Sequence, residues 1–135
     1  MEAETAETKE HGGFSELIGV KYSDLGPDEA RGSVEVGPHL LQPYGVVHGG
    51  VYASLAESIC SAATYRAVRE DGMVAFGQSN STTFLRTIAD GHVNALARAR
   101  QRGRTTWVWD VELSDDDGTV CALVRMTVAV RPARG

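Results

Sequence analysis

The spacing of apolar residues divides this chain into segments with different periods. Within residues 20–36, apolar side chains recur at short spacings on both sides of the turn sequence Gly26-Pro27-Asp28. This pattern predicts two strands joined by a tight turn. From Gly49 to Arg69 the apolar residues recur about every 3.6 positions, which predicts one long amphipathic helix. Its apolar face contains Tyr52, Leu55, Ile59, Ala62 and Ala63.

The rest of the chain has the pattern of strands. Four apolar-rich segments follow Asp71-Gly72: Val74 to Leu85, Val93 to Arg102, Thr105 to Leu113 and Val120 to Arg131. Turn sequences separate them, at residues 90–91, 102–103 and 115–118, so we expect consecutive strands to pair as antiparallel hairpins. Two strands, one long helix and four strands predict an α+β fold whose antiparallel sheet buries one face against the central helix.

Length and composition indicate one domain. The chain has 135 residues, 42 % of them hydrophobic, which is enough for a single core. Residues 1–12 are charged and poor in apolar groups, so we expect a flexible acidic tail before a domain that spans residues 13–135. No apolar stretch approaches the roughly 20 residues that span a bilayer. Cys60 and Cys121 form no CxxC pair or Cys/His cluster, which argues against a metal site and favours a cytoplasmic protein.

Charge argues against nucleic acid as a partner. The formal net charge is −5, although the segment from Arg86 to Arg104 is locally basic. Arg98, Arg100 and Arg102 alternate along one predicted strand. Alternation of this kind is typical of a solvated outer face, and it also allows a local site for an anion.

The start of the predicted helix carries the first candidate chemistry. Residues 42–61 read QPYGVVHGGVYASLAESICS, so that His48, Gly49 and Gly50 lie where the helix begins. Backbone N–H groups at a helix start have no partner within the helix and lie at the positive end of its dipole. They can polarise a carbonyl oxygen, and glycine lets that oxygen approach closely. The alternative interpretation is that the glycines only permit a tight entry into the helix.

Glu57 is the second candidate, since it is the only carboxylate between Gly49 and Arg69. At about 100° per residue, its face of the helix contains small and polar residues. These are Gly50, Ala53, Ser54, Ser61 and Thr64. Ser61, one turn further on, could hold the carboxylate or a water molecule. Such a carboxylate suits a nucleophile or general base, whereas the alternative is an ordinary surface glutamate.

The separation of the two candidates has a consequence for assembly. At 1.5 Å per residue, Glu57 lies about 12 Å along the helix from Gly49 and cannot act on a carbonyl held at its own helix start. If the two work together, they come from different chains. A two-fold homodimer with antiparallel helices would bring Gly49 of one chain to Glu57 of the other, and small residues on that face would permit close approach.

These residues resemble a known family. The stretch QPYGVVHGGVYASLAESICS is similar to the hotdog-fold thioesterases, in which Gln or Asn precedes His-Gly-Gly and an acidic residue follows seven positions after the second Gly. The resemblance is to the branch of 4-hydroxybenzoyl-CoA, 1,4-dihydroxy-2-naphthoyl-CoA and enterobactin-pathway proofreading thioesterases, together with the PaaI-like enzymes, and it covers Phe14 to Arg131. It implies a helix wrapped by an antiparallel sheet, and assembly into homodimers and often homotetramers.

The resemblance also implies roles for individual residues. Glu57 would be the catalytic carboxylate, which attacks the thioester carbon or activates water. The Gly49 N–H would bind the thioester oxygen, with His48 beside it. Gln42 would position the carbonyl or the water, and Ser61 would support the carboxylate. Glutamate with serine four residues later resembles the aromatic-acyl branch more than the PaaI type.

Substrate contacts follow from the same resemblance, with one departure. Gly50 would line the substrate, and Arg102 and Arg104 would bind the phosphates of coenzyme A. In FGQSNSTTFLR, Phe84 stands where some aryl-thioesterases carry a substrate-contacting histidine. Thr82 or Thr83 could supply the polar contact instead.

The implied activity is hydrolysis of an aryl- or medium-chain acyl-CoA to the free acid and CoA, with CoA as part of the substrate and no further cofactor. Two alternatives share the fold. One is a dehydratase or hydratase acting on acyl thioesters, although the Asp-x-x-x-x-His pattern common in such enzymes is missing from this sequence. The other is a non-catalytic acyl-CoA-binding protein, against which the presence of Glu57 argues.

Overall fold

The computed structural model describes residues 13–134, so the predicted tail at residues 1–12 lies outside the described residues. Within these residues, a short helix and two strands precede the long helix α3, and four further strands follow it. The bounds are α2 Phe14–Ile18, β1 Lys21–Leu25, β2 Glu29–Glu35, η1 Pro38–Leu40, α3 Gly49–Val68, η2 Arg69–Asp71, β3 Met73–Phe84, β4 His92–Arg102, β5 Thr106–Ser114 and β6 Val120–Pro132.

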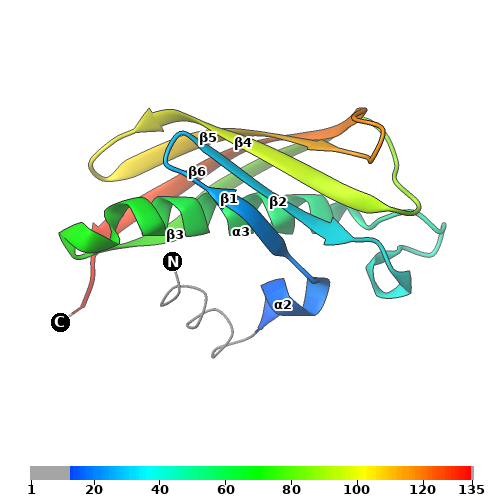
Figure 1. The fold of residues 1–135 in the computed structure, drawn as a ribbon, viewed down its shortest axis with the longest axis horizontal. Coiled ribbons are helices and arrows are strands. Elements are labelled where there is room, and N and C mark those ends of the chain that lie inside the picture. The colour runs from blue at the N-terminus through cyan, green and yellow to red at the C-terminus, as the bar shows by residue number, and fades with distance from the viewer. Residues whose placement is uncertain (1–12, 135) are drawn as a thin grey trace.

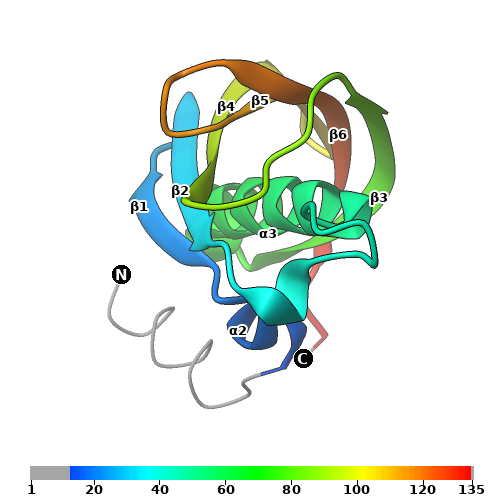
Figure 2. The ribbon, with the colours of Figure 1, turned by 90° about the vertical axis from the view of Figure 1, so that its right-hand side faces the viewer.

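The strands form one antiparallel sheet of six in the order β1-β2-β4-β5-β6-β3. Viewed along the helix, the sheet curves around α3 (Figure 2), and the helix lies along its concave side (Figure 1). This arrangement confirms the predicted α+β fold with one long central helix. The strands β1 and β3 are the two edges of the sheet.

One predicted pairing is wrong. The strands β3 and β4 follow each other in sequence but do not form a hairpin, because β3 pairs with β6 while β4 pairs with β2 and β5. The connection, residues 85–91, crosses the end of the molecule where α3 begins (Figure 2). Ile88 anchors this crossing, since it is buried and its carbonyl accepts a hydrogen bond of 2.7 Å from Val47 N–H. The turn sequence Asp90-Gly91 therefore leads into β4 without closing a hairpin.

The helix packs closely on the sheet. Leu55 and Ile59 are fully buried, and a Cβ atom at Gly32 of β2 would lie 2.8 Å from Ile59 Cγ2. Glycine at this position therefore sets how near the helix can approach.

Thr64 differs from expectation, because it lies in the core and not on the polar face. Its hydroxyl donates to Cys60 O at 2.7 Å and accepts from Trp109 Nε1 at 3.0 Å, which satisfies a buried indole.

Strand β3 contains a β-bulge. Its register with β6 shifts between Gly77 and Ser79, so that Gly77 pairs with Val128 while Ser79 pairs with Thr127. A bulge adds one residue to one strand and changes which side chains face each side of the sheet beyond it. The residues that follow the bulge in β3 take part in the candidate site.

Within residues 13–134, Cys60 and Cys121 are both free and buried. Within this part of the chain, no helix is long and apolar enough to span a bilayer. The same residues contain no group of three His, Cys, Asp or Glu side chains placed to hold a metal ion.

Candidate active site

Glu57 lies at a pocket. Its side chain is exposed on α3, and the pocket beside it has a volume of about 610 Å³. Residues from three elements line it, namely Phe14 and Ser15 of α2, Ala53, Ser54, Glu57 and Ser58 of α3, and Asn80 and Thr82 of β3. Small side chains dominate the helical wall, so the carboxylate can be reached from solvent. The α2 wall is tied to the helix by a hydrogen bond of 2.8 Å between the hydroxyls of Ser15 and Ser58.

Two residues of β3 fix the position of the carboxylate. The Asn80 side-chain amide donates to Ala53 O at 3.0 Å and approaches Glu57 Oε1 at 3.5 Å. On the other side, the carboxylate lies against Gly77, where an added Cβ would be 2.8 Å from Glu57 Oε2. The sequence analysis singled out neither Gly77 nor Asn80. No local signal marks them, because both act through contacts with a helix far away in sequence.

The start of α3 has a defined hydrogen-bond arrangement. His48 is the N-cap residue, and its Nδ1 accepts from Gly50 N–H at 2.9 Å. A ring nitrogen that accepts carries no proton, so the ring proton of a neutral His48 lies on Nε2. This hydrogen bond satisfies the Gly50 N–H. Among the described residues, Gly49 N–H has no acceptor, which leaves it as the free donor at this end of the helix.

Gly49 is also required for packing. A Cβ at this position would lie 2.9 Å from Phe84 Cζ, so the Phe84 ring occupies the space next to the glycine. Phe84 makes an edge-to-face contact with Tyr52, with ring centroids 5.9 Å apart. The place proposed for a substrate-contacting histidine is thus held by an aromatic ring that covers the helix start.

Neither Gln42 nor Ser61 lines the pocket at Glu57. Gln42 begins a tight turn in which its carbonyl accepts from Gly45 N–H at 2.9 Å, and Leu41 and Val47 form an isolated bridge behind it. This turn comes shortly before the start of α3 in the sequence. Ser61 is half-buried on α3, and within residues 13–134 no hydrogen bond joins it to Glu57. The contact expected from Ser61 is made by Asn80 instead.

The two threonines lie on opposite faces of the sheet. Thr82 lines the Glu57 pocket, and its hydroxyl donates to Asn80 Oδ1 at 2.7 Å. Thr83 lines a separate hollow on the outer face of the sheet, together with Glu112 and Arg125. Of the two alternatives left open by the sequence, only Thr82 faces the pocket that contains Glu57.

The arginines of β4 form an ion-paired outer face. Arg98 pairs with Glu29 at 3.4 Å and Arg100 with Asp110 at 3.4 Å. Arg102 pairs with Asp28 at 3.2 Å. These pairs agree with the simpler interpretation of a solvated, charged strand face.

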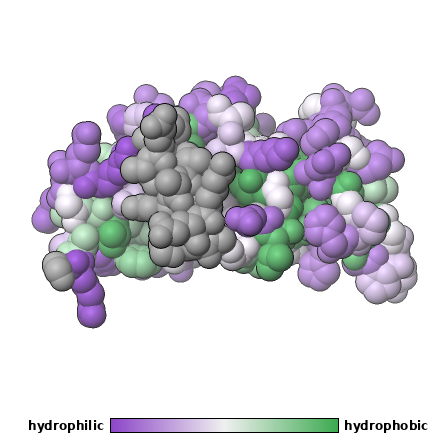
Figure 3. Space-filling view, turned by 60° about the horizontal axis from the view of Figure 1, so that its bottom comes forward, coloured by the Kyte–Doolittle hydropathy of each residue, from purple (hydrophilic) through white to green (hydrophobic). Residues whose placement is uncertain are grey.

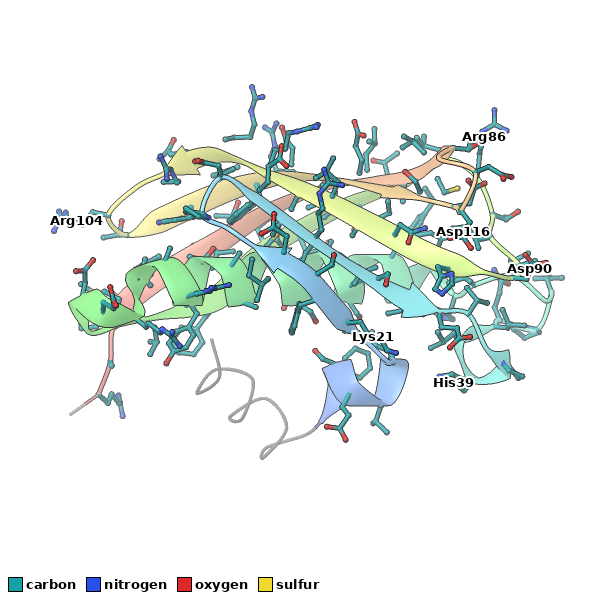
Figure 4. All side chains as sticks on the ribbon, viewed as in Figure 1. Lys21, His39, Arg86, Asp90, Arg104 and Asp116 are labelled. Atoms are coloured by element: carbon teal, nitrogen blue, oxygen red, sulfur yellow. The ribbon has the colours of Figure 1, made fainter. Side chains whose placement is uncertain are left out.

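Arg104 is different from the arginines of β4. In the part of the chain that the structure describes it has no ion-pair partner. It lies at the opposite end of the molecule from Arg86 and Asp116, and therefore away from the start of α3 (Figure 4).

Cys60 does not serve as a nucleophile, although it is three residues from Glu57. Its thiol is fully buried. Burial, and secondarily the nearby Glu57 carboxylate, raises the pKa of the Cys60 thiol far above its ordinary value. Glu57, in contrast, is exposed and lines the pocket.

A long helix wrapped by an antiparallel sheet is the architecture of the hotdog fold. The model of the thioesterase superfamily matches residues 44–122, and the chain belongs to this superfamily. The matched segment contains the start of α3, Glu57, Asn80 and the whole of β4 and β5. The chain is accordingly a thioester hydrolase by family.

Individual relatives agree in sequence and structure. Protein PA1618 of Pseudomonas aeruginosa is 37 % identical over 122 residues, which cover 90 % of this chain and 84 % of the relative. The solved structure of a variant of PA1618, described as a thioesterase, has a TM-score of 0.88 at 35 % identity and covers 97 % of this chain and 93 % of that chain.

Two further relatives are named as thioesterases. The proofreading thioesterase EntH of Cronobacter turicensis is 32 % identical over 119 residues, covering 88 % of this chain and 86 % of the relative. The structure of thioesterase HI1161 from Haemophilus influenzae has a TM-score of 0.83 at 30 % identity, covering 90 % of this chain and 84 % of that chain.

Proposed function

We propose that this enzyme hydrolyses an aryl- or medium-chain acyl-CoA thioester to the free acid and CoA, as a PaaI-like member of the superfamily. One observation carries the proposal: Glu57 is an exposed carboxylate in a pocket of about 610 Å³ whose other walls offer no competing charge. The Phe14 ring at the pocket provides an apolar contact for an acyl group. Coenzyme A enters only as part of the substrate, and the reaction uses no further cofactor.

The proposed chemistry needs one carboxylate and one oxyanion donor. Glu57 either attacks the thioester carbon, forming a mixed anhydride that water then hydrolyses, or removes a proton from water that attacks directly. In both routes the C–S bond breaks and the thiolate of CoA leaves and takes a proton. In this proposal the Gly49 N–H stabilises the oxyanion, and His48 and Gln42, from the preceding loop, help to position the carbonyl or the water.

The donor and the carboxylate belong to different chains in this proposal. Within one α3 they are about 12 Å apart along the helix. A homodimer with antiparallel helices brings the partner's Gly49 to Glu57, and two dimers form a homotetramer.

The surface of the chain supports a partner on this side. Strand β3 is an edge of the sheet, and the large apolar side chains Phe76, Phe84 and Leu85 on or directly after it are exposed. Figure 3 shows apolar surface on the side of the molecule where α3 lies.

Solved structures of one relative support the choice of Glu57 and Gln42 as site residues. Structures of two variants of the Staphylococcus aureus protein SAV0944 have been solved, one with a glutamate and one with a glutamine replaced by alanine, at 26 % and 25 % identity to this chain. The two replaced positions have the same separation in sequence as Glu57 and Gln42. EntH, by its name, is a proofreading thioesterase, which agrees with thioester hydrolysis.

The test is release of free thiol from aromatic, short-chain, medium-chain and long-chain acyl-CoAs. Wild-type enzyme should turn over the aromatic or medium-chain esters, and Glu57→Ala should lower kcat at least about a hundredfold. Glu70→Ala, an exposed glutamate beyond the end of α3, is the matched control and should leave kcat unchanged. Unchanged turnover in Glu57→Ala would refute the assignment. Hydration of an enoyl ester without thiol release, or binding without turnover, would replace the proposed activity.

Mixed dimers test the shared site. Glu57→Ala and Gly49→Val chains should each be inactive alone, yet a heterodimer of the two contains one intact site. A statistical mixture should therefore recover about a quarter of wild-type activity. Well-formed mixed dimers without recovery would count against the two-chain site.

The phosphate contact has its own test. Arg104→Ala and Arg102→Ala should raise KM for a CoA ester more than for the matching pantetheine ester. Equal effects on both esters would exclude the contact. Arg102 should show the smaller effect, because Asp28 already neutralises it at 3.2 Å.

A further inference from the structure

We propose that Asn80, with its amide orientation held by Thr82, is a positioning residue that sets the carboxylate of Glu57 for catalysis. The inference deepens the proposed function and rests on Glu57 as its catalytic carboxylate. It assigns Thr82 a role through Asn80, where the family resemblance suggested a contact with substrate.

The hydrogen bonds of Asn80 leave little freedom to its side chain. Its Nδ2 donates one hydrogen to Ala53 O at 3.0 Å, and the other approaches Glu57 Oε1 at 3.5 Å. Its Oδ1 accepts from the Thr82 hydroxyl at 2.7 Å. All three partners fit one orientation of the amide, because a flipped Asn80 would place its oxygen against the Ala53 carbonyl and the Glu57 carboxylate, which are both acceptors.

The Asn80 amide links the strand to the helix at the reacting group. Ala53 lies one helical turn before Glu57. The same Nδ2 group of Asn80 can therefore donate to the backbone of α3 and approach the Glu57 carboxylate. Gly77 lies against the other oxygen, with an added Cβ only 2.8 Å from Oε2. The carboxylate is therefore confined between an N–H donor and a residue without a side chain.

The long contact with Glu57 suits a positioning role. Hydrogen bonds of catalytic groups are often long in the free enzyme and shorten when substrate binds. A donor to the carboxylate restricts the directions in which it can attack, and a misplacement of about 1 Å can cost about a hundredfold in rate. Asn80 itself contributes no proton and no new bond to the reaction.

The experiment compares Asn80→Ala, Thr82→Val and Thr82→Ser with wild type in thiol release from the best acyl-CoA substrate. Asn80→Ala should lower kcat about tenfold to a hundredfold with KM changed less than about threefold. Thr82→Ser keeps the donor hydroxyl and should retain nearly full kcat, whereas Thr82→Val should lose part of it. Ser81→Ala, the next residue on the outer face of the sheet, is the matched control and should not change kcat.

The combination of variants separates positioning from substrate binding. If Thr82 acts through Asn80, the Asn80→Ala/Thr82→Val double variant should lose no more kcat than Asn80→Ala alone. Additive losses, or a rise in KM without a change in kcat, would overturn the proposal. Wild-type kcat in Asn80→Ala would overturn it as well.

A measurement without substrate keeps this inference distinct from the proposed function. NMR relaxation of the Glu57 side chain should show lower order in Asn80→Ala and Thr82→Val than in wild type and Ser81→Ala. Unchanged order would overturn the positioning role even if Glu57 proves catalytic. If no acyl-CoA is hydrolysed by wild type, the proposed function fails, and the relaxation data still decide whether Asn80 orders Glu57.

Discussion

Replacing Gly77 by alanine should separate activity from stability. The added Cβ would lie 2.8 Å from Glu57 Oε2, 3.0 Å from Glu57 Cδ and 3.0 Å from Met126 Cε. Carbon contacts are comfortable at about 3.5 to 4.0 Å, so the carboxylate must move by roughly 0.5 to 1 Å. Gly77 does not have a positive φ angle, and alanine fits the backbone there without strain. The clash therefore falls on side-chain ends.

The expected magnitudes differ between the two properties. A displacement of this size should lower kcat by about tenfold to a hundredfold. The free energy of unfolding should change by about 1 kcal/mol or less, since both contacted groups end flexible side chains and alanine reduces the entropy of the unfolded chain. Thiol-release kinetics and urea unfolding measure the two effects.

The double variant with Glu57→Ala tests the route of the Gly77 effect. If Gly77→Ala acts only through the carboxylate, adding it to Glu57→Ala should cause no further loss of residual activity. A further loss, or full kcat in Gly77→Ala alone, would refute the reasoning. The second result would mean that the carboxylate does not need the position in which β3 holds it.

Three further outcomes can be measured on the folded protein. Thr64→Val should cost about 1 to 3 kcal/mol in urea unfolding, because the Trp109 indole N–H loses its buried acceptor, whereas Thr64→Ser keeps it. Cys60 should react with a thiol reagent only after unfolding, since it is buried and its pKa is raised. A hydrogen bond from Asn94 lowers the pKa of Asp116, so its stabilisation is present above the unfolded pKa and is lost as pH falls. The thermal stabilities of wild type and Asp116→Ala should therefore differ at pH 7 and converge as the pH falls below the ordinary pKa of an aspartate, about 3.9.

The elements with local signals could be predicted from the sequence. The turn at Gly26-Pro27-Asp28 and the helix from Gly49 to Val68 follow from spacing, and both are confirmed within a residue or two. Glu57 was recognisable because it is the only carboxylate in that helix.

Features that depend on long-range contacts could not be predicted in this way. The partner of β3 was misassigned, because a turn sequence at Asp90-Gly91 does not reveal that the preceding residues cross the molecule. Thr64 was placed on the polar face, because a buried hydroxyl and a surface hydroxyl look alike until the Trp109 N–H is placed beside it. Asn80 binds Ala53 and Glu57 across an element boundary, and nothing near it in the sequence indicates that contact.

The bulge in β3 lets two residues that are three apart in sequence face the same carboxylate. In a regular strand, residues three apart point to opposite faces, yet Gly77 and Asn80 both contact Glu57. The register shift between Gly77 and Ser79 makes this arrangement possible. Gln78 is the extra residue, and a regular strand of the same length would turn either Gly77 or Asn80 away from the helix. The single extra residue in this strand thus sets which side chains beyond the bulge face the helix.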